Sequence, residues 1–162
     1  MGTYFNPNNE SFTRDKNSKI YIDKTGLLDY LNDVICTNGN CIAVSHARRF
    51  GKSHAAGMID AYYSRGCDSY ELFKDTEIAT KDNFKKYMNQ YNVIHLDIAS
   101  FWDDYKDNIV ENIVAYIYKE FKEVFGTRVA NNGKKVRSNH ILLSFLKNEF
   151  KHKRFYNLEC MN

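Results

Sequence analysis

The sequence predicts an α/β fold in which a parallel sheet is flanked by helices. Two short apolar runs, at 41–45 and 92–97, are typical of buried strands. Helical patterns lie before, between and after these runs, and the strongest covers 103–125, where Ile109, Ile113 and Ile117 recur at helical spacing. Because strands that alternate with helices favour a parallel sheet, we expect helices to cover its faces.

The first third of the chain supplies an arm, a short strand and two helices. Residues 1–19 are polar and contain the single proline, Pro7, so we expect an extended N-terminal arm, followed by one domain over 20–162. After a β-type run at 20–22, Thr25 is a candidate N-cap for a helix over 25–36, and a second helix is expected over 52–63. The apolar face of the first helix consists of Leu27, Leu28, Leu31 and Ile35.

The remaining helices follow from weaker signals. Shorter helical pieces are expected over 69–73 and 81–91. Beyond the long helix over 103–125, Asn131, Asn132 and Gly133 break the pattern. Ser138 or Asn139 can then cap a last helix that reaches about residue 152.

Composition indicates a folded cytoplasmic domain. The chain has 162 residues, of which 43% are hydrophobic, and this excludes an intrinsically disordered chain. Its N-terminus is polar and no run approaches the length needed to span a membrane, so we expect no membrane partner. The four cysteines show no metal-binding spacing, and we expect each to be a reduced, buried thiol: Cys36, Cys41, Cys67 and Cys160.

The charge is unevenly distributed along the chain. Residues 128–154 contain eight Lys or Arg and one Glu, a balance of +7, whereas the whole chain carries +3. The rest of the chain is therefore mildly acidic. A basic segment of this kind indicates a protein partner or a nucleic-acid-associated complex. The alternative is a solvated helix face, and the oligomeric state is left open.

A candidate phosphate-binding loop follows the first apolar run. It reads His46-Ala47-Arg48-Arg49-Phe50-Gly51-Lys52-Ser53 and stands between an expected strand and an expected helix. In a P-loop, backbone N–H groups and the helix dipole bind phosphate oxygens, the Lys reaches the terminal phosphates, and the hydroxyl binds Mg²⁺. His46 occupies the position of the usual first Gly, so the motif is degenerate. The alternative is a tight strand-to-helix turn with exposed basic residues.

Five motifs lie in the first hundred residues: MGTYFNP at 1–7, IYIDKT at 20–25, RRFGKS at 48–53, AYYSRGCDS at 61–69 and VIHLD at 93–97. Together they resemble the predicted AAA-ATPase family of P-loop NTPases, whose domain often precedes a PD-(D/E)XK nuclease-like domain. The resemblance implies ATP and Mg²⁺ as ligands, with Lys52 on the β- and γ-phosphates, Ser53 on Mg²⁺, and the backbone of 48–51 around the phosphates.

The chain also departs from the family pattern. Family members usually have Arg-Pro where this chain has His46-Ala47, and they continue into a Walker B strand that ends in Asp-Glu. The corresponding stretch here is 155–162, in which Glu159 is the one acidic residue. The resemblance therefore implies a domain truncated before a proper Walker B, with little or no hydrolysis on its own.

Two further polar positions have alternative interpretations. Asp97 follows the second apolar run, where a Mg²⁺-binding carboxylate is one interpretation and a helix cap is the other. Asp23, Lys24 and Thr25 follow the run at 20–22, and they form either a contact near the base or ribose of a nucleotide or a helix cap.

Two functions remain open from the sequence. The first is an ATP-binding domain with a degenerate Walker A motif. The second is a non-catalytic binding or inhibitor protein, of the kind that phages and mobile elements encode, which reuses the ATPase scaffold against a nucleic-acid-binding complex.

Overall fold

The computed structural model describes residues 2–45, 47–104, 108–125 and 157–158. Within these residues the chain is mostly helical, and the expected parallel sheet is not seen. The prediction of an α/β fold with a partial P-loop-like parallel sheet is therefore wrong for the described part of the chain. What replaces the sheet is a group of helices around α3 and a separate pair, α6 and α7.

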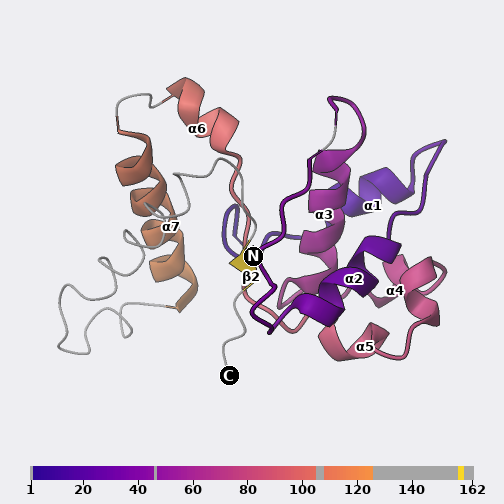
Figure 1. Cartoon of the computed structure of the whole chain (residues 1–162). Helices are drawn as coiled ribbons and strands as arrows, with labels where there is room; N and C mark the ends of the chain where they lie inside the picture. The colour runs from indigo at the N-terminus through magenta and orange to yellow at the C-terminus, as the bar shows by residue number, and fades with distance from the viewer. Residues whose placement is uncertain (1, 46, 105–107, 126–156, 159–162) are drawn as a thin grey trace.

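The first group of helices consists of α3 and the helices that lie beside it and below it in Figure 1. Every residue of α3 from Ala56 to Tyr63 is buried, because other parts of the chain pack on more than one side of this helix. Phe12, Leu28, Tyr62 and Phe73 are almost fully buried in the shared core. The elements are α1 (Glu10–Lys16), α2 (Gly26–Val34), α3 (Lys52–Tyr63), α4 (Tyr70–Phe73), the 3₁₀ helix η1 (Glu77–Thr80) and α5 (Phe84–Tyr87).

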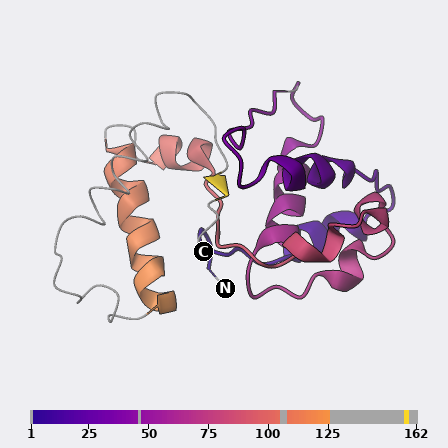
Figure 2. The same cartoon turned by 60° about the horizontal axis from the view of Figure 1, so that its bottom comes forward.

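The second group consists of α6 (Ile98–Asp104) and α7 (Ile109–Phe125). Figures 1 and 2 show these two helices apart from the group around α3. Phe101, Ile113 and Ile117 are buried together and form a second apolar cluster. This spacing along α7 confirms the helical periodicity, although the single helix expected over 103–125 begins at Ile109 and is preceded by α6.

The strands are short and antiparallel. Strand β1 (Val93–Ile94) pairs with β2 (Asn157–Leu158), and Ile94 also forms an antiparallel bridge with Phe5. The run at 41–45 adopts no strand and instead borders a small apolar pocket with Leu27, Leu31 and Ile59. A strand needs hydrogen bonds and side-chain contacts with a neighbouring strand, so an apolar run without such a neighbour does not form one.

Two of the expected helices are confirmed, whereas the expected extended arm is not. The helix over 52–63 is confirmed at the bounds of α3, and α2 lies within the helix expected over 25–36. The arm at 1–19 is not extended throughout, because it contains α1, which buries Phe12. The expected last helix and the basic segment 128–154 lie outside the described residues.

Two further expectations concern membranes and cysteines. No helix in the described part of the chain is long and apolar enough to cross a membrane. Cys41 and Cys67 are free thiols, and Cys41 is exposed. Cys36 is exposed and disulfide-bonded, so the expectation of reduced, buried thiols is wrong for Cys36, and the expectation of burial is wrong for Cys41.

Candidate phosphate-binding loop

The backbone φ angle alternates in sign at successive residues just before α3. Arg49 has φ of 69° and Gly51 has φ of 78°, while Phe50 between them has a negative φ. Lys52 then begins the right-handed α3. Alternation of this kind turns successive N–H groups toward one side, and the resulting concave surface binds anions. A left-handed Arg costs about 1–3 kcal/mol, and strain of this size is typical of ligand-binding loops.

The first turn of α3 continues this N–H surface. Gly51 is the N-cap, and no side chain caps the helix. The first N–H groups of a helix have no acceptor within it, and the helix dipole places partial positive charge there. An anion at this end would accept hydrogen bonds from these N–H groups and would also interact favourably with the partial positive charge.

The two P-loop side chains lie at the start of α3. The ammonium of Lys52 donates to the carbonyl of Ala47 at 2.9 Å, so the side chain reaches back across the loop. Ser53 is exposed, which leaves its hydroxyl accessible to a metal ion beside bound phosphates. The side chain of Lys52 thus already lies against the loop that the sequence assigns to phosphate.

Basic side chains extend the positive charge of the loop. Arg48 and Arg49 are exposed, as is the ring of Phe50, whose relative exposure is 57%. His46, which stands in place of the first Gly of the motif, lies outside the described residues. The structure therefore brings together Ala47 to Ser53 but does not test the degenerate first position.

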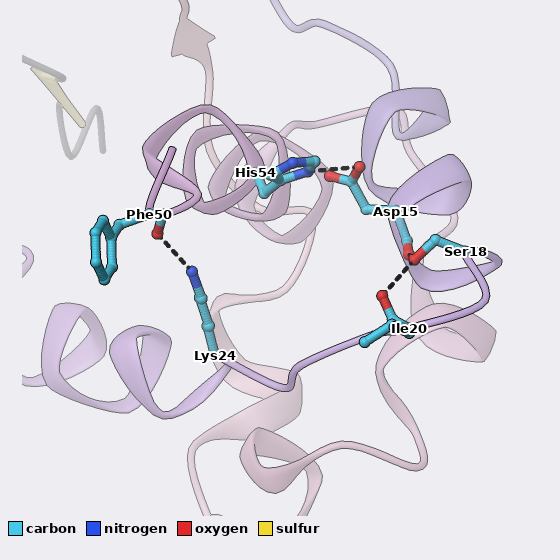
Figure 3. Close-up of polar contacts among 6 residues, drawn as sticks. All are labelled: Asp15, Ser18, Ile20, Lys24, Phe50 and His54. Atoms are coloured by element: carbon cyan, nitrogen blue, oxygen red, sulfur yellow. Dashed lines mark hydrogen bonds and ion pairs between the residues drawn. The ribbon is translucent and has the colours of Figure 1, made fainter. Parts of the chain in front are cut away.

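A lysine distant in sequence also contacts the loop. Lys24 donates from its ammonium to the carbonyl of Phe50 at 2.8 Å (Figure 3). Its neighbour Asp23 accepts hydrogen bonds from the backbone N–H groups of Thr25 and Glu77, both at 2.8 Å. Partial burial opposes ionisation of Asp23, but these two N–H donors hold its pKa below the usual value.

Thr25 occupies the expected N-cap position of α2, but its side chain makes no capping hydrogen bond. Its fully buried hydroxyl instead accepts a hydrogen bond from the N–H of Ile78 at 3.2 Å. The Asp23-Lys24-Thr25 segment therefore joins the candidate phosphate-binding loop to η1.

The first helix supports the other side of α3. The Nδ1 atom of His54 lies 2.6 Å from Oδ1 of Asp15, at the end of α1 (Figure 3). The hydroxyl of Ser18 lies within hydrogen-bond distance of the carbonyls of Asp15 and Ile20, at 2.6 and 2.8 Å, and can donate its one proton to either in the turn after α1. These contacts fix the segment that leads from α1 to Lys24.

Asp97 caps the helix that follows it. Its Oδ1 accepts from the N–H of Ala99 at 3.0 Å, and its Oδ2 accepts from the hydroxyl of Ser100 at 2.9 Å. Both oxygens are thus used at the start of α6. No group of three or more His, Cys, Asp or Glu side chains suited to a metal ion occurs among the residues the structure describes.

A second polar pair was not expected from the sequence. Asp60, on the buried face of α3, is 4% exposed and contacts Nδ1 of His95, just after β1. The hydrogen bond that the ring of His95 donates to the Asp60 carboxylate raises the pKa of His95, although burial of the ring opposes this. Neither this pair nor the Lys24 contact follows from local sequence, because each joins residues far apart in the chain.

One of three comparisons with known proteins identifies a family. No curated protein and no solved structure matches the chain significantly. One family model, described as predicted AAA-ATPase, matches residues 10–156. That range includes the loop, all of α3 and the Lys24 segment, and it covers most of the chain. The chain therefore belongs to the predicted AAA-ATPase family.

Proposed function

We propose that this chain binds the phosphates of ATP on the loop from Ala47 to Gly51 and the first turn of α3. The observation that carries the proposal is the alternating backbone at Arg49, Phe50 and Gly51, which leads into a helix start without a side-chain cap. Membership of the predicted AAA-ATPase family supports a nucleoside triphosphate as the anion.

Three elements of the site have separate roles in the proposal. The N–H groups from Arg49 to Ser53 surround the phosphate oxygens. Lys52 exchanges its bond to the Ala47 carbonyl for the β- and γ-phosphates, a rearrangement within reach of a flexible side chain. Ser53 and the phosphates hold Mg²⁺, which neutralises their charge.

The proposal is for binding with slow turnover. Hydrolysis requires a residue that orients the attacking water, and in this family's pattern an acidic pair has that role. Asp97, a candidate from the sequence, uses both oxygens to cap α6, and capping is the role we assign to it. We therefore expect ATP to act as a bound ligand of this chain.

Calorimetric titration with Mg-ATP tests the proposal directly. Wild type should bind, and Lys52→Ala should lose at least about tenfold in affinity because the charge-assisted bonds to phosphate are lost. A ligand at a hundred times its dissociation constant adds about 2.7 kcal/mol of stability. For a domain of this size this raises the melting temperature by roughly 5–10 °C.

The matched control is Lys19→Ala, which removes an exposed lysine of the turn after α1. It should bind Mg-ATP as wild type does. Equal affinity of wild type and Lys52→Ala would rule out the proposed site, and absence of binding by wild type would rule out the function.

A further inference from the structure

The phosphate loop has a contact that the P-loop motif does not contain. Lys24 precedes α2 and lies 26 positions before Phe50, whose carbonyl accepts its ammonium hydrogen bond. Figure 3 shows the side chain of Lys24 directed at this carbonyl from the segment that follows Ile20. The bond therefore joins two segments that the sequence motif treats as independent.

Planarity of the peptide group gives this contact a consequence for ligand binding. The carbonyl of Phe50 and the N–H of Gly51 belong to one planar group and point in opposite directions. Holding the carbonyl fixes the direction of the N–H, which belongs to the alternating stretch that faces the anion. The positive charge on the carbonyl oxygen also polarises the peptide, and this strengthens the N–H as a donor.

The base of the Lys24 side chain is itself held in place. Asp23 accepts two backbone N–H groups, one from Thr25 and one from Glu77. Thr25 is fully buried and accepts the N–H of Ile78. Although Lys24 is exposed, the backbone on which it stands is fixed on both sides.

Gly51 supplies independent geometric support. Its φ of 78° is strained for residues with a side chain, and a Cβ atom there would lie 2.5 Å from the ammonium of Lys24. The lysine thus occupies the space that the glycine leaves. The close approach of Lys24 therefore depends on Gly51, the same residue that provides the positive φ in the loop.

We infer that Lys24 is a positioning residue of the phosphate loop, which holds the Phe50–Gly51 peptide in the orientation that binds phosphate. The inference rests on the proposed function, because it assigns to Lys24 a role at the same site. It assigns no contact between Lys24 and the base or ribose of the nucleotide.

The test compares Lys24→Met, Lys24→Arg and the control Lys19→Met with wild type. Mg-ATP affinity is measured by calorimetry, the melting temperature is measured without ligand, and the backbone amide of Gly51 is followed by NMR. Lys24→Met should bind about five- to tenfold more weakly, a loss that suits a charged hydrogen bond at an exposed position. It should also shift the Gly51 amide while leaving the ligand-free melting temperature within about 2 °C of wild type.

Lys24→Arg restores a charged donor, so it should recover most of the affinity and the position of the Gly51 resonance. Lys19→Met should match wild type in both measurements. If Lys24→Met binds as tightly as wild type while Lys52→Ala does not, the inference is overturned and the proposed function stands. Equal weakening by Lys19→Met and Lys24→Met would also overturn it, because loss of general positive charge would then explain the effect. If wild type itself does not bind, both fail.

Discussion

At Asp60, a carboxylate is buried in α3, the helix that begins at the candidate phosphate-binding loop. Its Oδ2 contacts His95, and its Oδ1 has no hydrogen-bond partner within the part of the chain described. A buried carboxylate with one unsatisfied oxygen depends strongly on a cationic neighbour. The hydrogen bond with Asp60 raises the pKa of His95, burial opposes the rise, and the charges of Asp60 and Asp97 add to it.

This pair predicts a dependence of stability on pH. Because the pKa of His95 is higher in the folded state than in the unfolded state, its contribution is complete below the unfolded value of about 6.5. That contribution is lost as the pH rises through the folded pKa. Urea unfolding of wild type should therefore give a smaller free energy of unfolding at pH 8.5 than at pH 6. His95→Asn should remove most of this decrease, and an unchanged decrease in the variant would contradict the assignment.

Among the elements, most helices and the position of β1 within the run at 92–97 were predictable, but α1 and the pairing of the strands were not. Gly51 before an apolar pattern marks the start of α3, and the pattern of Leu28 and Leu31 marks α2, because helical hydrogen bonds are local. Strand β1 instead depends on Phe5 and Leu158, which lie far away in sequence. Composition and periodicity do not contain these pairings.

The same distinction applies to the candidate site. The loop from Ala47 to Ser53 was predictable as a motif, since its residues are consecutive. The contact from Lys24 to Phe50 and the pair formed by Asp60 and His95 were not, because tertiary packing creates them. The left-handed conformation of Arg49 also carries no sequence signal, because only Gly, Asn and Asp adopt it readily.

Packing of α1 on α3 gives a prediction at the scale of elements. Gly57 lies at this contact, where a Cβ atom would lie 2.9 Å from Oγ and 3.2 Å from Cβ of Ser11. Gly57→Val should therefore lower the free energy of unfolding by about 1–3 kcal/mol, as overpacking does. Ser11→Gly should recover part of this loss in the double variant, as measured by urea unfolding. Additive effects of the two changes would show that the helices are not in close contact there.

Across the whole molecule, the N-terminal residues join two apolar clusters. The larger cluster surrounds α3, and the smaller one contains Phe101, Ile113 and Ile117. Tyr4 packs on Phe101 with ring centroids 5.4 Å apart, whereas Asn6 exchanges hydrogen bonds with Val93 of the larger cluster. The stretch from Tyr4 to Asn6 therefore contacts both clusters.

Glu120 on α7 forms hydrogen bonds that connect the stretch from Tyr4 to Asn6 to the helix that carries the smaller cluster. Its carboxylate accepts the N–H of Tyr4 at 2.9 Å and a longer bond from the N–H of Phe5 at 3.4 Å. Such charged hydrogen bonds at a partly exposed site contribute about 1–2 kcal/mol. We expect Glu120→Ala to loosen α6 and α7 while the helices around α3 keep their stability, because none of the lost bonds lies within the larger cluster.

Hydrogen exchange resolves these two responses in one experiment. In Glu120→Ala, amides of α7 near Ile113 and Ile117 should exchange about five- to thirtyfold faster than in wild type, as a loss of 1–2 kcal/mol implies. Amides of α3 should exchange at the wild-type rate. The matched control is Glu123→Ala, since Glu123 is an exposed carboxylate one turn along the same helix. Equal acceleration in α3 and α7 would show that the two clusters unfold as one unit, and the connection through Tyr4 would then serve the whole fold.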